Sequence, residues 1–130
     1  MGSILERPYL YFGLAYGVLG MSLGIHMAAT HNHGQLVTHA HLLLVGFLLS
    51  TLYAVMHRLW LEHPNRILAG LQFLAHHFGT VVLISALFLL YGNIYPLDVL
   101  EPVLASASLV VLGALVLMAY MIVRYPKRDT

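Results

Sequence analysis

Four long apolar segments, joined by short polar links, decide what this chain can fold into. They cover about residues 9–30, 36–60, 67–91 and 100–123 of the 130 residues. Each is long enough to cross a bilayer as a helix, which takes about 20 predominantly apolar residues. The links are short and contain glycine, proline or asparagine, so consecutive segments must run antiparallel. The sequence therefore predicts an all-α, integral membrane four-helix bundle with up-down-up-down topology, and a single transmembrane domain over residues 1–130.

The low charge of the chain excludes a water-soluble globule. Hydrophobic residues make up 60% of the sequence and charged residues 8%, whereas soluble domains carry about 25% charged residues. The six Lys and Arg form no basic stripe that could neutralise a row of phosphates, which excludes nucleic acid as a partner. The chain has no cysteine, so disulfide scaffolds, iron–sulfur clusters, thiolate zinc sites and covalently attached c-type haem are excluded as well.

All six cations fall at one end of the predicted bundle. They flank the first span, the middle link and the last span, as Arg7, Arg58, Arg66, Arg124, Lys127 and Arg128. Short loops that remain in the cytoplasm collect Lys and Arg. We therefore expect both termini to be cytoplasmic, in a bacterial-type inner membrane, with membrane lipid around the bundle.

Nine histidines stand out in a chain that otherwise avoids polar groups. Ionisable side chains inside membrane spans are costly and usually functional. With a rise of about 1.5 Å per residue, His26, His39 and His41 are expected to share a layer near the outer face. The same measure puts His76 and His77 near the middle of the membrane.

The other four histidines are expected at the membrane boundaries. His31 and His33 belong to a polar turn after the first span, and we expect them to be exposed. His57 and His63 lie beside the inner boundary and are expected to be interfacial.

Helical periodicity indicates which side of each helix these residues occupy. At about 100° per residue, His39 and His41 point about 200° apart, so they cannot both face one iron. The side of span two that carries His39 continues with small and polar residues, namely Gly46, Ser50, Tyr53 and His57. In span three, a similar stripe predicts that His76 rather than His77 faces the interior, and it consists of Gln72, His76, Gly79 and Thr80.

A stripe of glycines follows one side of the first span, at Gly13, Gly17, Gly20 and Gly24. Small residues allow a second backbone or a flat cofactor to approach closely. His26 lies about 200° from Gly24 around the helix. If His26 faces the interior, the stripe faces another subunit and makes a homo-oligomer; if it does not, His26 is not a ligand.

Buried imidazoles on different helices suit haem iron, copper or zinc. The candidate haem b ligands are His26, His39, His41 and His76, and the candidate metal-ion ligands, with copper as the first alternative, are His33, His39, His41, His76 and His77. A haem needs two imidazoles at one depth, whereas a histidine-only ion site needs three or four that converge, so haem fits the predicted directions better. One alternative is an accessory subunit of a larger oxidase. The other is a non-haem copper or zinc binding or transport protein with successive sites at His31, His33, His39, His76 and His77.

The histidine motifs resemble a known family. The stretch from Thr38 to Phe47 reads THAHLLLVGF, His33 precedes it, and His76 and His77 follow in the third span. Over about residues 15 to 90, this pattern is similar to small four-span membrane proteins related to subunit I of the haem-copper oxidases.

In that large subunit, a His-x-His on one helix binds two haems from opposite faces and a His-His pair on another binds copper. The resemblance implies haem at His39 and His41, copper at His76 and His77, and an oxidoreductase-like role in electron transfer or in redox or gas sensing. The expected partners are a redox protein or a quinol. The chain departs from the large subunit in having far fewer spans, no further copper-ligand histidine and no intramembrane carboxylates.

Overall fold

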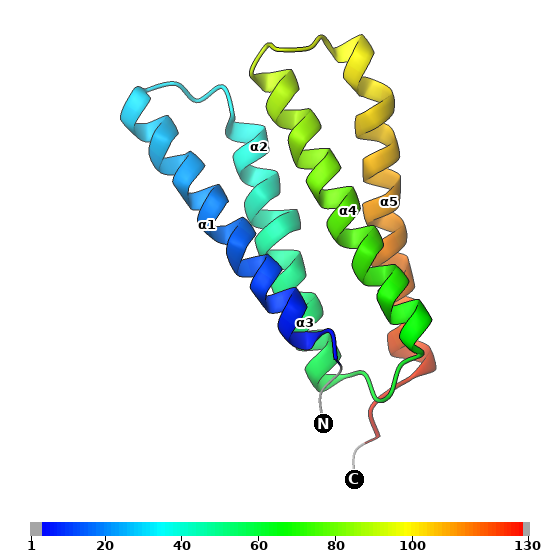
Figure 1. Ribbon diagram of the computed structural model, residues 1–130. Coiled ribbons are helices and arrows are strands. Elements are labelled where there is room, and N and C mark those ends of the chain that lie inside the picture. The colour runs from blue at the N-terminus through cyan, green and yellow to red at the C-terminus, as the bar shows by residue number, and fades with distance from the viewer. Residues whose placement is uncertain (1–3, 129–130) are drawn as a thin grey trace.

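The computed structural model describes residues 4–128, which form four long helical rods (Figure 1). The first rod is α1, Glu6–Thr30, and the third and fourth are α4, Arg66–Tyr91, and α5, Leu97–Arg124. The second rod is continuous but has three parts, which are α2, Leu36–His41, the π-helical segment η1, Leu42–Leu48, and α3, Leu49–Leu59. No strand occurs between residues 4 and 128, where Leu61 and Pro126 make an isolated bridge. The predicted all-α four-helix bundle is confirmed.

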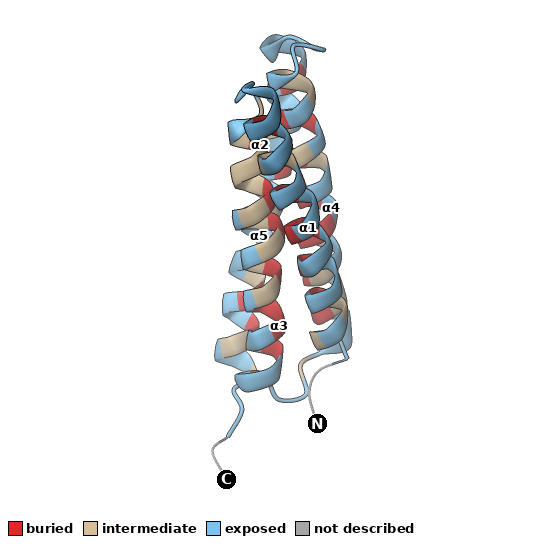
Figure 2. Cartoon of the chain, turned by 90° about the vertical axis from the view of Figure 1, so that its left-hand side faces the viewer, coloured by how far each residue is buried: buried red, intermediate tan, exposed pale blue. Residues whose placement is uncertain are grey.

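Each of the four rods is long and apolar enough to cross a membrane. Large apolar side chains cover the outside of the bundle, while buried residues follow its inner faces (Figure 2). On the second rod, the side away from the small and polar stripe of His39 is aliphatic and exposed, at Leu44, Leu48, Leu52 and Val55. This arrangement is the one expected of helices that are surrounded by lipid rather than by water.

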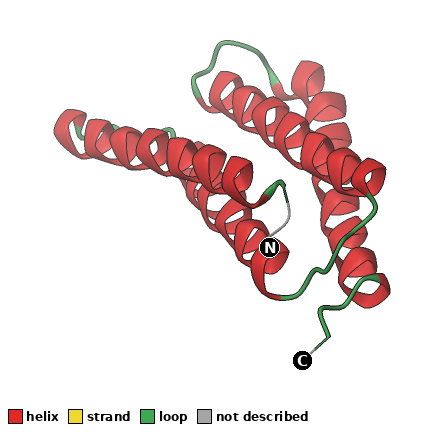
Figure 3. Cartoon of the chain, turned by 60° about the horizontal axis from the view of Figure 1, so that its bottom comes forward, coloured by secondary structure: helices red, strands yellow, loops and turns green. Residues whose placement is uncertain are grey.

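The rods pack as two hairpins (Figure 3), α1 against the second rod and α4 against α5. The N-terminus, the C-terminus and the link between α3 and α4 share one end of the bundle, which we call the terminal end. All six Lys and Arg belong to this end. At the opposite end, α1 stops at His31, whose φ of 53° is left-handed.

The glycine stripe of α1 packs against the second rod of the same chain. A Cβ atom on Gly17 would lie 3.0 Å from the Phe47 ring, and one on Gly24 would lie 2.8 Å from Cε1 of His39. Gly13 and Gly20 face the same rod. The stripe is therefore filled within the chain, so of the two alternatives given by the sequence, the one in which it faces another subunit is wrong. The sequence left two partners open because a run of glycines favours close packing without selecting the helix that approaches.

The π-helical segment η1 lies directly after the His-x-His pair. Its last hydrogen bond runs from the backbone N–H of Leu49 to the carbonyl oxygen of Leu44, five residues back. A regular α-helix would make this bond four residues back. Short π-helical turns are rare in proteins, and many of those that occur lie at functional sites. This segment therefore points to a functional role for the middle of the second rod.

Candidate functional site

His39 and His41 are held by backbone carbonyl groups. Nδ1 of His39 lies 2.8 Å from the carbonyl oxygen of Gly20 on α1, and Nδ1 of His41 lies 2.8 Å from that of Val37 on its own helix. A carbonyl oxygen only accepts hydrogen bonds, so Nδ1 must carry the proton in both rings. In the neutral imidazole, Nε2 then keeps its lone pair, and this is the arrangement in which histidines commonly bind metals.

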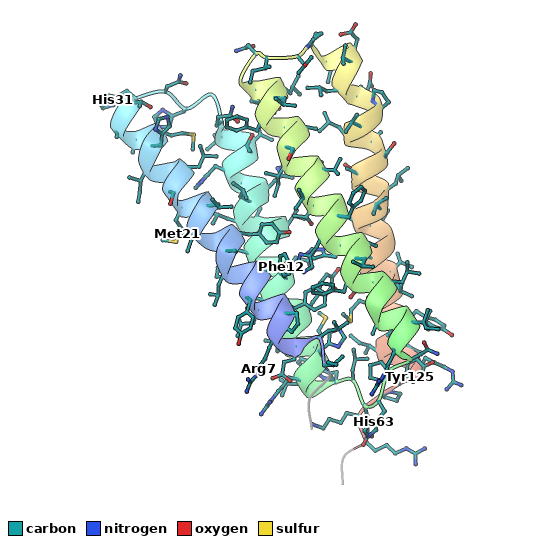
Figure 4. The ribbon with its side chains drawn as sticks, viewed as in Figure 1. Arg7, Phe12, Met21, His31, His63 and Tyr125 are labelled. Atoms are coloured by element: carbon teal, nitrogen blue, oxygen red, sulfur yellow. The ribbon has the colours of Figure 1, made fainter. Side chains whose placement is uncertain are left out.

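The other candidates near the opposite end do not join this pair in the interior. His26 lies on the exposed side of α1, away from the glycine stripe. Since His26 does not face the interior of the bundle, it is not a ligand there. His31 and His33 are exposed, as predicted, and His31 lies at the tip of the first hairpin (Figure 4).

A second group of histidines lies deeper, between the two hairpins. His57 on α3 and His76 on α4 are fully buried, and His77 is 6% exposed. The rings of His76 and His77 have centroids 4.9 Å apart. Tyr9 of α1 lies between them and His57, with ring centroids 5.5 Å from His57 and 5.2 Å from His77. We call Tyr9, His57, His76 and His77 the buried histidine cluster.

Hydroxyl groups rather than carbonyl groups contact these imidazoles. Ser50 Oγ lies 2.8 Å from Nε2 of His76, and the Tyr16 hydroxyl lies 3.1 Å from Nδ1 of His77. The remaining imidazole nitrogens of the cluster have no hydrogen-bond partner; they are Nδ1 and Nε2 of His57, Nδ1 of His76 and Nε2 of His77. Buried polar atoms are nearly always hydrogen-bonded, so four unpartnered nitrogens in one cluster point to a function.

Gln72 fixes the position of the tyrosine in this cluster. Its Nε2 donates to the carbonyl oxygen of Ala114 on α5, at 3.3 Å, so its Oε1 is turned towards α1. The Tyr9 hydroxyl donates to that oxygen. Gln72 is fully buried, and it therefore ties α1, α4 and α5 together at the level of the cluster.

Aromatic and apolar side chains close the surroundings of the cluster. Phe12 reaches from α1 towards α4 (Figure 4), and its ring centroid is 4.4 Å from that of His77. Phe73 contacts His77 from the same helix, at 4.5 Å. Farther from the terminal end, Leu83 and Leu87 form an apolar cluster with Ala107. The polar region is thus bounded by apolar contacts on its far side.

The structure adds to the prediction for His57 and corrects the one for His77. His57 lies in the last turn of α3, at the terminal end of the bundle as expected, and it is buried there against the ring of Tyr9, whose centroid is 5.5 Å away. His77 is buried together with His76, because rings from α1 cover the neighbouring side of α4. The stripe that runs from His39 through Ser50 and Tyr53 to His57 was the signal that could have identified His57.

The arrangement of the donors distinguishes between the candidate cofactors. Within residues 4–128, no three His, Asp or Glu side chains converge as a metal ion requires. Haem iron takes four ligands from its porphyrin and needs only one or two imidazoles from the protein. His39 and His41 fit that requirement in donor chemistry, since each presents one free Nε2. Compared with known protein families, characterised proteins and solved structures, the chain has no match.

Proposed function

We propose that this chain is a membrane-spanning b-type haem protein that serves electron transfer or redox and gas sensing, with His39 and His41 as iron ligands. The observation that carries the proposal is the pair of hydrogen bonds from Nδ1 to backbone carbonyl oxygens, at 2.8 Å in both residues. These bonds fix the tautomer and leave Nε2 as the ligating atom. When bound, haem would supply a one-electron redox centre.

The chain's own residues would orient the ligands and keep water away. The Gly20 carbonyl holds the His39 ring against α1, and the ring fits there because Gly24 has no side chain: a Cβ atom at that position would lie 2.8 Å from Cε1 of His39. His41 is fixed within its own helix, by Val37. The two rings leave the helix on different sides, so each would ligate a separate iron.

The resemblance to subunit I of the haem-copper oxidases supports the same ligands. Copper is not included in the proposal, because no third donor converges on His76 and His77 among residues 4–128. The proposal places the chain in a bacterial-type inner membrane with both termini cytoplasmic, as all six cations lie at the terminal end. A redox protein or a quinol would exchange electrons with the haem.

Absorption spectra of the purified protein, oxidised and dithionite-reduced, test this function. We expect a Soret band that shifts on reduction. Sharp α and β bands in the reduced spectrum would show that the iron has a second axial ligand besides the histidine. The variants His39→Ala and His41→Ala should each lose haem, since each removes one ligand. The matched controls are His31→Ala, in the exposed turn, and His76→Gln, in the buried histidine cluster, and both should keep the wild-type haem content.

Full haem content in both ligand variants would refute the ligand assignment. A colourless wild-type protein with stoichiometric copper or zinc, after expression with ample haem, would refute the function itself. Carbon monoxide added to the reduced protein separates the two roles, since an open iron position that binds the gas is required for sensing and is not required for electron transfer.

A further inference from the structure

We propose that the groove between α1 and α3, at the terminal end of the bundle, binds an anionic phospholipid, with the phosphate at Arg7 and Arg58 and an acyl chain along an apolar floor. The inference does not depend on haem. It rests on the order of the side chains along the groove, which are charged at the membrane boundary and apolar farther in, as the parts of a phospholipid are.

The groove lies where α1 begins and α3 ends, and its volume is about 270 Å³. Its mouth is formed by Glu6, Arg7 and Arg58, and the lining continues into the bundle as far as Thr51. Thr51 precedes Arg58 by seven residues, which is about 10 Å along a helix. The groove is therefore long enough to hold a phosphate group and the first part of one acyl chain.

The mouth carries a net positive charge. Arg58 donates to the Glu6 carboxylate at 3.0 Å. A guanidinium group has five N–H donors, so the others of Arg58 can bind a further acceptor. Arg7 is exposed at the terminal end (Figure 4) and has no ion-pair partner among residues 4–128. Two arginines and one carboxylate thus face the position where the phosphate of a lipid would lie, and the arginine fork matches phosphate in geometry.

The floor of the groove is apolar and open to the surroundings. Leu10 on α1 and Val55 on α3 are 38% and 39% exposed. The Thr51 hydroxyl donates to the carbonyl oxygen of Phe47, at 2.7 Å, so its hydrogen bond is made within its own rod. Beyond Thr51 the two rods close, because a Cβ atom on Gly13 would lie 3.0 Å from Thr51 Oγ1. An acyl chain would therefore lie against Leu10 and Val55 and leave the groove near Thr51.

A second groove, between α4 and α5, provides a comparison within the same chain. The described residues that line it are uncharged and mostly apolar, and they include Phe78, Val82, Pro102 and Val103. Such a lining accommodates an acyl chain but does not distinguish between headgroups. Basic pockets between membrane helices bind the headgroups of anionic lipids. A zwitterionic lipid would bring its choline cation beside the two arginines, so the groove between α1 and α3 should favour a lipid with net negative charge.

Photocross-linking in phosphatidylcholine vesicles tests this site. The full-length protein is reconstituted with a small fraction of phosphatidylglycerol or phosphatidylcholine that carries a photoactivatable group in its acyl chain, and mass spectrometry locates the adducts. We expect adducts at Leu10, Val55 or Leu59, with at least a fivefold excess from the phosphatidylglycerol probe. Arg7→Gln should lower this excess about fivefold, which corresponds to the roughly 1 kcal/mol that one basic residue contributes at an anionic membrane surface.

Glu6→Gln should change the excess in the opposite direction, because it removes the carboxylate of the mouth and releases Arg58. Arg66→Gln is the matched control and should leave the excess unchanged. Arg66 is exposed at the terminal end, as the first residue of α4, and does not line the groove. Retained helical content in circular dichroism shows that each variant is folded.

Three results would each overturn the site. The first is equal labelling of the groove by both probes in the wild type, and the second is an unchanged excess in folded Arg7→Gln. The third is an equal loss in Arg7→Gln and Arg66→Gln, which would show that the total charge of the terminal end, rather than the groove, selects the lipid. Haem content does not enter the measurement, so the lipid site and the haem assignment fail separately.

Discussion

A Cβ atom on Gly46 would lie 2.7 Å from Cγ of Tyr16. The tyrosine ring thus packs directly on the backbone of η1. In this position, the hydroxyl oxygen of Tyr16 lies 3.1 Å from Nδ1 of His77 on α4. One glycine in the second rod therefore determines where a side chain of α1 contacts the other hairpin.

Gly46→Ala should destabilise the protein, because the rigid stem of Tyr16 cannot move aside without breaking its contact with His77. Overpacking of this kind costs about 1–3 kcal/mol. Gly113→Ala is the matched control, since no atom lies within 4 Å of a Cβ built there, and removing a helical glycine stabilises by up to about 1 kcal/mol. Thermal unfolding in detergent, followed by circular dichroism, compares the two. Equal melting temperatures would contradict the packing described.

The hydrogen bond between Tyr9 and Gln72 should show strong coupling in a double-mutant cycle. Gln72→Leu leaves the buried Tyr9 hydroxyl without a partner, which costs about 1–3 kcal/mol in the free energy of unfolding. Tyr9→Phe in the same background removes that hydroxyl, so the double variant should lose less stability than the sum of the two single losses. Strictly additive losses would show that the bond is absent in the folded protein.

The orientation of the bundle can be measured by cysteine labelling, because the chain has no cysteine of its own. We expect Asn32→Cys, in the link between α1 and α2, to react with a membrane-impermeant maleimide in intact cells. Glu62→Cys, in the link between α3 and α4, should react only after the inner membrane is permeabilised. The reverse pattern would place the termini outside and overturn the orientation inferred from the cations.

The architecture followed from the sequence because spanning length and polar links are local properties. The burial of Ser50 and Tyr53 on the second rod, and of Gln72, His76 and Thr80 on α4, also followed from periodicity. The residues of these stripes are small or polar, whereas their neighbours are strongly apolar. This contrast made it possible to predict which side of the second rod and of α4 faces the interior.

The partners across the bundle could not be read in the same way. Helix α1 carries apolar side chains all round, and its glycines showed where it could pack closely but not against which helix. The burial of His57 and His77 depends on rings that α1 brings to them, namely Tyr9 and Phe12. Such contacts join residues more than forty positions apart, so no local pattern contains them. The π-helical segment was not anticipated either, since its sequence is as apolar as that of its neighbours.

That segment also fixes how the part of the second rod that carries His39 is turned relative to the part that carries His57. Because η1 accommodates one more residue in its turn than an α-helix does, loss of a single residue from 42–48 would let a regular helix form. It would also rotate His57 by about 100° around the rod relative to His39. The number of residues between the His-x-His motif and His57 therefore decides whether both face the inside of the bundle. In a related sequence with one residue fewer there, the motif would be intact, but the histidine at the position of His57 would point in another direction.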